Sequence, residues 1–239
     1  MNKKTRWFFL GILAVILCSQ LLWALPAGPV INYVSNSTAA SVSTSRNQDE
    51  KGTITVININ SNQQDYKWKA YVGNVTGKLA LDDATASTIY DWTLGTPTGE
   101  VYVSRASSIA WANVTCANQT VINDEQTVLG MLSTDSDNIN KTFNYTLHQG
   151  ILVGTKTIAN STCRSTATYI SDTPQNINEN ALFQEVLLSD SFTGSLIYTT
   201  LIEDNQVGYN GQTYDFQLLV AENESSTTPT LYYFYVELG

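Results

Sequence analysis

The stretch that decides the fold class is the last one, Leu231-Tyr-Tyr-Phe-Tyr-Val-Glu-Leu238. Its residues alternate between two faces, which is the period of a β-strand, and it is rich in the aromatic and β-branched residues that strands favour. Both faces are apolar, and the stretch has neither Lys nor Pro to protect an exposed edge. We therefore expect a central strand with Tyr232, Phe234 and Val236 buried.

The same alternation recurs upstream of this strand. It predicts strands over residues 53–60, 67–72, 79–81, 90–94, 101–104, 196–202 and 214–220, with one or two more within 142–156. Asn210-Gly211 is a strong turn signal between two of them. Asp124 could cap one short helix over 124–132, and 180–188 fits a helix or a strand. Short strands about ten residues apart predict an all-β protein, a β-sandwich of antiparallel strands with at most one or two short helices.

The N-terminus has the pattern of an export signal. Lys3, Lys4 and Arg6 precede an apolar run, and small residues near Ala24 and Ala27 suit cleavage. We assign residues 1–27 to this signal. The alternative is an uncleaved anchor, because residues 7–25 would form a helix about 28 Å long, enough to span a bilayer. Both interpretations place the rest of the chain outside the cell.

Two regions follow the signal. Residues 28–52 form a linker rich in Ser, Thr and Asn, and residues 53–239 form the sandwich, with a possible sub-boundary near residue 120.

Charge and composition exclude some classes of function. The chain has 239 residues, of which 12 are basic and 21 acidic, and only 14% are charged. Beyond the basic end, nine basic residues stand against 21 acidic ones, a formal charge of −12. No basic stripe is present to neutralise phosphates, which argues against a nucleic-acid partner. The 43% hydrophobic content needs burial, so the chain is not disordered throughout.

Cys116 and Cys163 are the two cysteines left beyond the signal, which contains Cys18. In an oxidising compartment an even number of cysteines favours a disulfide. A metal pair would need further ligands, and His148 is the only histidine. We therefore expect the two cysteines to be joined.

Asn-x-Ser/Thr sequons are more numerous than chance predicts, and one directly precedes each of these cysteines. If modified, they mark exposed surface. The candidates for glycosylation are Asn36, Asn74, Asn113, Asn118, Asn140, Asn144, Asn160 and Asn223.

Four stretches carry a resemblance to a known group of proteins. They are residues 68–77 (WKAYVGNVTG), 99–105 (GEVYVSR), 214–220 (YDFQLLV) and 232–239 (YYFYVELG). They resemble a secreted protein family of archaea, chiefly of uncultured lineages, over nearly all of the exported chain. The resemblance implies a prokaryotic cell surface, where an export signal and N-glycosylation coexist. It implies no activity, cofactor or catalytic residue.

Catalytic chemistry finds little support in the sequence. A Ser-His-Asp site would depend on His148, and no serine lies in a nucleophile-elbow pattern. A carboxylate pair for glycoside hydrolysis is nonspecific in so acidic a chain. Its possible members are Asp82, Asp83, Asp91, Glu100 and Glu185.

A calcium site is the best metal hypothesis, although a solvated acidic turn is the simpler interpretation. Asp135, Asp137, Asn138 and Asn140 gather hard oxygen ligands in one loop. The loop lacks the glycine and the distal Glu of a calcium loop, and Ile139 stands at a ligand position. We therefore expect no metal centre and no cofactor.

Aromatic residues could form a sugar-stacking face. Its members would be Trp68, Trp92, Trp111, Tyr71 and Tyr102. Alternation places Trp68 and Trp92 with apolar neighbours, so we expect both to be buried in the core.

Together these features predict a non-catalytic structural or adhesion protein, extracellular or at the cell surface. A carbohydrate-binding module is the first alternative and an acidic secreted hydrolase the second. The expected partners are other surface proteins or glycans, with membrane attachment through residues 7–25 and homo-oligomerisation both open.

Overall fold

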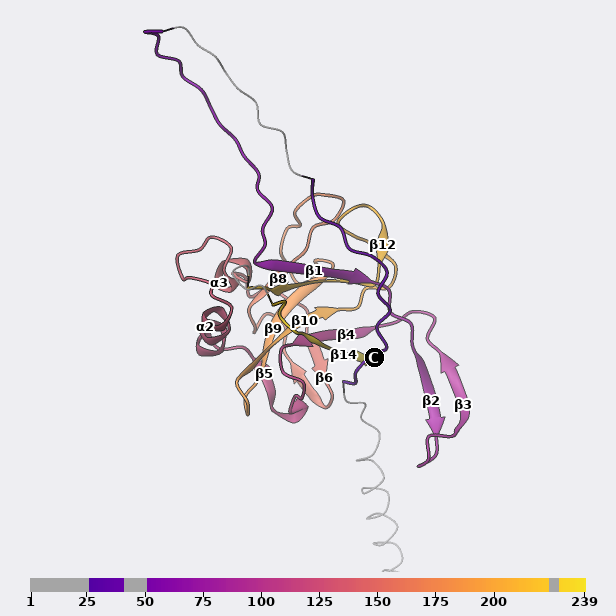
Figure 1. The fold of residues 1–239 in the computed structure, drawn as a ribbon. Helices are drawn as coiled ribbons and strands as arrows, with labels where there is room; N and C mark the ends of the chain where they lie inside the picture. Colours follow the sequence, from indigo (N-terminus) through magenta and orange to yellow (C-terminus); the bar gives the residue numbers. More distant parts are fainter. Residues whose placement is uncertain (1–25, 41–50, 224–227) are drawn as a thin grey trace, which may run out of the picture.

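A computed structural model describes residues 26–40, 51–223 and 228–239 (Figure 1). The protein is mostly β, with 34% of residues in strands and 8% in helices, which confirms the predicted all-β, sandwich-like class. The predicted signal, except for its last two residues, lies outside the described residues. Within the described residues, no helix has the length and apolar character needed to cross a membrane.

The largest sheet is antiparallel and runs in the order β14-β4-β10-β9-β5, with β8 also paired to β9. β5 and β8 share one edge of β9, and strands from both sides of residue 120 take part. The members are β4 (Gly99–Ser104), β5 (Val114–Cys116), β8 (Ser165–Ala167), β9 (Gln184–Asp190), β10 (Ser195–Leu201) and β14 (Tyr233–Leu238).

Alternation along these strands creates two cores, one on each face of the sheet. Val101 and Val103 of β4 face the first core, which helices α2 (Gln119–Val128) and α3 (Ile139–Thr142) and strand β13 (Phe216–Ala221) help to build. Tyr102 of β4 faces the second core, which β6 (Ile151–Val153) and β7 (Lys156–Ile158) cover. The sheet is therefore buried on both sides.

Smaller sheets complete the fold. β13 pairs with β1 (Trp68–Gly73), and β11 (Gln206–Val207) pairs with β12 (Thr213–Tyr214) around the predicted turn at Asn210-Gly211. Gly211 has a φ of +80°, which a residue without a Cβ adopts at low cost. β2 (Lys78–Asp82) and β3 (Thr88–Thr93) form a two-stranded arm that projects from the body (Figure 1). Residues Trp111–Asn113 form a 3₁₀ turn before β5.

The predicted helix begins earlier than expected. Asn118, not Asp124, is its cap, because the Asn118 side chain accepts the N–H of Val121 at 3.0 Å. One of the predicted strands differs as well. Residues 53–60 form no strand, whereas β6 lies within the predicted 142–156 region and begins only at Ile151. The ambiguous segment 180–188 contains most of β9.

The prediction that the last strand is central is wrong. β14 is the end strand of the large sheet, and among the described residues it pairs with β4 and, through an isolated bridge, with Ala27. Phe234 packs on the first core and Tyr235 on the second, so both faces are covered as the sequence suggests. Solvent still reaches the strand from its open side, which leaves Tyr232, Phe234 and Val236 half-buried.

Candidate functional site

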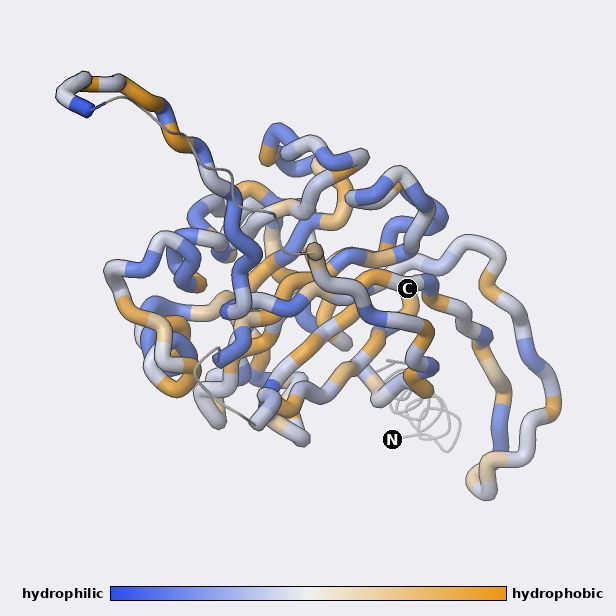
Figure 2. The backbone as a smooth tube through the Cα atoms, turned by 45° about the horizontal axis from the view of Figure 1, so that its top comes forward, coloured by the Kyte–Doolittle hydropathy of each residue, from blue (hydrophilic) through white to orange (hydrophobic). Residues whose placement is uncertain are grey.

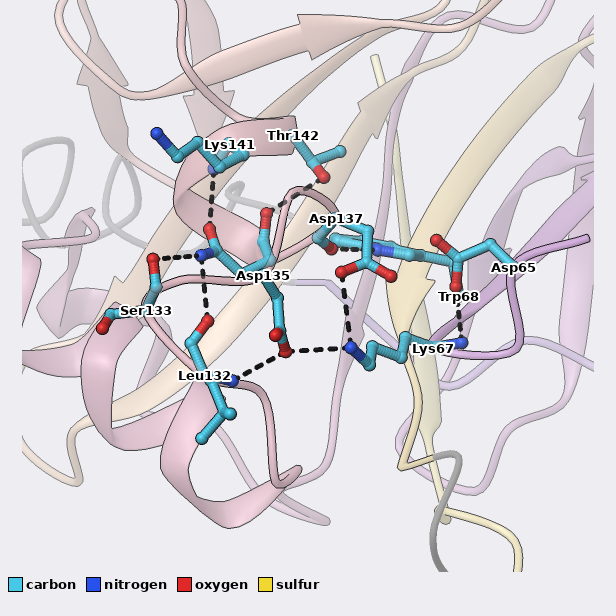
Figure 3. Close-up of polar contacts among 10 residues, drawn as sticks. Asp65, Lys67, Trp68, Leu132, Ser133, Asp135, Asp137, Lys141 and Thr142 are labelled. Carbon is cyan, nitrogen blue, oxygen red and sulfur yellow. Dashed lines mark hydrogen bonds and ion pairs between the residues drawn. The ribbon is translucent and has the colours of Figure 1, made fainter. Parts of the chain in front are cut away.

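Two of the four predicted calcium residues, Asp135 and Asp137, lie beside the ammonium group of Lys67 instead of converging on a cation site (Figure 3). Lys67 Nζ lies 2.9 Å from Asp135 Oδ2 and 3.4 Å from Asp137 Oδ1. The hydrogen bond from Lys67 holds the pKa of Asp135 below its usual value. The Asp137 carbonyl accepts the Trp68 Nε1–H at 2.6 Å. These contacts fasten the start of β1 to the loop before α3.

The two asparagines of the predicted site point elsewhere. Asn138 caps α3, since its side chain accepts the Lys141 N–H at 2.9 Å, and Asn140 donates to Gln126 and Asn123. Across the described residues, no group of three or more His, Cys, Asp or Glu could hold a metal ion.

His148 is fully buried and its ring nitrogens both have backbone partners. Nε2 accepts the N–H groups of Thr162 and Cys163 at 3.0 and 2.9 Å, and Nδ1 donates to the Gln149 carbonyl at 2.6 Å. These bonds set the neutral tautomer with the proton on Nδ1. The imidazole therefore holds the loop that carries Cys163.

Cys116 and Cys163 are joined in a disulfide, with Cα atoms 5.0 Å apart. Cys116 ends β5, and Cys163 precedes β8. Because β5 and β8 share one edge of β9, the bond ties together two short strands that have no ladder to each other.

The acidic residues proposed as a carboxylate pair do not meet. Asp82 and Asp91 lie on the projecting arm, and Asp83 in its turn. Glu100 and Glu185 lie in the large sheet but face opposite cores, since Glu185 receives the N–H of Leu219 from β13 at 2.8 Å. Burial raises the pKa of Glu185 well above its usual value.

Glu100 has a different acidic neighbour, which sequence reasoning missed. Glu237 of β14 stands directly opposite Glu100 of β4, and both are buried in the second core. The Glu237 carboxylate accepts the Gly154 N–H at 2.9 and 3.0 Å and the Tyr102 hydroxyl at 3.1 Å. Each glutamate stood out in the sequence as a single charge within an otherwise apolar strand.

Burial and the charge of Glu237 raise the pKa of Glu100 to about 8. Glu100 therefore holds its proton at pH 7. Burial raises the pKa of Glu237 as well, although its hydrogen bonds from Gly154 and Tyr102 favour the ionised form. A proton donor beside a carboxylate could serve acid–base chemistry, but the β6–β7 hairpin covers both groups. The Glu100–Glu237 pair is thus a pH-sensitive contact between β4 and β14 at one end of the sheet.

We expect the Glu100→Gln substitution to flatten the pH dependence of stability. Between the ordinary pKa of 4.5 and about 8, folded Glu100 keeps a proton that the unfolded chain has released. The free energy of unfolding therefore falls as the pH rises through this window. Urea unfolding at pH 5 and pH 8.5 should show a fall smaller by about 2–3 kcal/mol in the variant.

The control for this measurement is Asp82→Asn on the exposed arm, which should keep the wild-type fall. Equal falls for wild type and Glu100→Gln would show that this carboxyl ionises alike in the folded and unfolded chains.

The five aromatic residues proposed as a sugar-stacking face are not assembled. Tyr102 is fully buried, and Trp111 packs between Tyr102 and Tyr235 with ring centroids 5.1 and 5.2 Å away. Trp68 and Tyr71 are half-buried against the first core. Trp92 contradicts the prediction of burial, because its side chain is 51% exposed.

Trp92 belongs to the apolar face of the arm. Leu79 lies opposite Trp92, and Leu81 lies opposite Tyr90, so these four exposed side chains share one face. The Lys78–Asp91 ion pair occupies the other face. Alternation correctly placed Trp92 with apolar neighbours. Those neighbours face solvent, because no described element of the body buries them.

The arm is unusual because it is a two-stranded hairpin with every residue of both strands exposed to solvent. An isolated two-stranded hairpin is marginally stable in water, and three strands or a packed face are normally needed. All eleven residues of β2 and β3 are exposed. Figure 2 shows apolar segments along the arm, away from the body.

The sequons are distributed unevenly over the surface. Asn36, Asn74, Asn113, Asn118, Asn144 and Asn160 are exposed, while Asn140 and Asn223 are half-buried. Residues 78–93 of the arm contain no sequon. A glycan would therefore not be attached to the apolar face itself.

A shallow hollow of about 350 Å³ lies beside the end of α2, next to Arg105. The Arg105 guanidinium already makes two hydrogen bonds of 2.7 Å to Glu125. Among the described residues that line the hollow, Arg105 is the charged one, and its charge is already paired.

Comparisons with protein-family models, with curated proteins and with solved structures found no match to this chain.

Proposed function

We propose that the protein is a non-catalytic structural protein of the cell surface that assembles with copies of itself. The observation that carries this proposal is the β2–β3 arm, whose apolar face of Leu79, Leu81, Tyr90 and Trp92 lies open to water. Apolar surface of this kind marks a contact with another molecule. The location rests on the N-terminal signal pattern, the sequons and the resemblance to secreted archaeal proteins.

A second copy is the partner that fits best. The same chain supplies the apolar arm and several small two-stranded sheets with strand edges of their own, so identical copies can pair with each other. The polar face of the arm carries the Lys78–Asp91 ion pair, in which the two charges neutralise each other, so the apolar face remains the main feature for a partner to recognise.

Carbohydrate binding is a weaker second candidate, supported by the exposed Trp92 and Tyr90. Their rings meet at 65°, with centroids 4.9 Å apart. A flat sugar ring stacks best on a single aromatic plane or on coplanar rings, which this pair does not offer.

The test replaces the apolar face while keeping strand-forming residues. The variant Leu81→Thr/Trp92→Thr should weaken self-association at least about tenfold in sedimentation measurements, because exposed aromatic anchors dominate such contacts. The control Ala80→Thr/Thr93→Ser changes the opposite face and should associate like wild type. Equal association of the two variants would contradict the proposal. Loss of binding to immobilised glycans, with self-association unchanged, would favour the carbohydrate-binding function.

A further inference from the structure

The two edges of the β1–β13 sheet differ in what covers them. The edge on the β13 side is closed by side chains of neighbouring segments. Glu185 accepts the Leu219 N–H at 2.8 Å, and the Thr200 hydroxyl donates to the Gln217 carbonyl at 2.8 Å. The Tyr232 hydroxyl donates to the Ala221 carbonyl. Buried polar groups thus replace a missing strand on this side.

The opposite edge, on β1, has no such cover. The Glu222 N–H donates to the Lys67 carbonyl, and the Asp215 N–H donates to the Gly73 carbonyl. The backbone N–H and C=O groups of odd-numbered residues in β1 therefore point toward β13. Hydrogen-bonded positions alternate in an antiparallel pair, and the backbone groups of Trp68, Ala70 and Val72 therefore point outward. Among the described residues, nothing pairs with them.

The same chain contains a strand-like segment that belongs to none of the sheets found among the described residues. Residues 53–60 read Thr-Ile-Thr-Val-Ile-Asn-Ile-Asn, uncharged and rich in β-branched side chains. Ile54, Val56 and Ile59 are 98, 89 and 81% exposed. The segment forms part of an extension that stands away from the body, and apolar residues are visible along it (Figures 1 and 2).

We infer that residues 53–60 of one copy add as a strand to the open β1 edge of a second copy. Strand addition satisfies backbone groups on both partners and takes the exposed isoleucines out of water. Neither the segment nor β1 contains an acidic residue, so this contact avoids the repulsion expected between copies whose sequence beyond the basic N-terminal end has a formal charge of −12. The inference rests on the proposed self-assembly and names its contact.

The contact also explains how assembly could continue. The segment and the edge are separate stretches of the chain, so each copy can give a strand to one neighbour and receive one from another. Such head-to-tail contacts close into rings or extend into filaments.

Cross-linking between copies tests the inference directly. A chain with Ile57→Cys is mixed with a differently tagged chain carrying Ala70→Cys, and mild oxidation leaves the native disulfide intact. We expect dimers containing both tags. The control replaces Ala70→Cys by Thr155→Cys in the β6–β7 turn, and it should give at most about a tenth of the mixed dimer, since cross-linking there needs random encounter. Equal yields would contradict the inference.

A chain carrying both Ile57→Cys and Ala70→Cys separates the two possible sources of the strand. Cross-linked dimers and larger species support addition to a second copy. Monomers closed on themselves would show that the segment returns to its own β1 edge, and would overturn the inference.

The variant Ile57→Pro distinguishes this inference from the proposed function. Proline removes a backbone donor needed for pairing, while residue 57 lies outside both cores. We expect association to weaken about tenfold or more with the melting temperature unchanged. If Ile57→Pro associates like wild type while Leu81→Thr/Trp92→Thr does not, strand addition is refuted and self-assembly through the arm is retained. Wild-type association in both variants would refute self-assembly as well.

Discussion

A chain that ends at Thr230 is expected to lose its cooperative unfolding transition. β14 pairs with β4 at six positions and contributes side chains to both cores. Its removal exposes Tyr71, which packs edge-on against Phe234 at 5.0 Å, and takes Glu237 away from Gly154 and Tyr102. Since a domain is stable by only about 5–15 kcal/mol, losing a strand that fills two cores exceeds this margin.

Thermal unfolding followed by circular dichroism checks this expectation. Tyr233→Thr is the matched control, because it changes an exposed side chain of the same strand and should keep the transition. A truncated chain that unfolds cooperatively, but no longer associates, would show that β14 serves contacts between copies and not the fold. That result would add β14 to the assembling surface.

Replacing both bridged cysteines, Cys116→Ser/Cys163→Ser, is expected to lower the free energy of unfolding by about 3–5 kcal/mol. The bond spans 47 residues, and its loss restores much conformational freedom to the unfolded chain. Without the bond, β5 and β8 lose their covalent connection. The loop whose backbone N–H groups bind His148 is then held less firmly. Urea unfolding measures the difference.

The matched control for the disulfide is Ser191→Ala. Ser191 is an exposed residue after β9 whose hydroxyl donates to the Asn113 carbonyl, close to β5, so its loss perturbs the same region without opening a loop. We expect about 1 kcal/mol or less from that change. A double variant that is no less stable than Ser191→Ala would contradict a structural role for the bond.

Local patterns predicted many strands well because they depend on residues close together in the chain. The period-2 alternation located β1, β2, β3, β4, β10 and β14, each within a few residues of its bounds. The helix was misplaced because two residues, Asn118 and Asp124, both suit a cap, and the Val121 N–H bonds to the first.

The candidate site was harder to predict because its partners are distant in sequence. Glu237 and Tyr102 are 135 residues apart, and no local pattern indicates that their strands are neighbours. The acidic loop at Asp135 resembled a cation site because the partner of its charge is also distant in sequence. That partner is Lys67, 68 residues earlier. Only strand pairing brings these groups together.

By itself the sequence determined the all-β class, the export pattern and which side chains share a strand face, because each depends on short-range periodicity or composition. Tertiary structure alone decided which faces are buried. Trp92 and Phe234 both lie in alternating apolar strands, yet Trp92 faces water and Phe234 packs against Tyr71. The reason is that burial depends on whether another element covers a face, and the order of strands in a sheet is set by long-range packing of the whole chain.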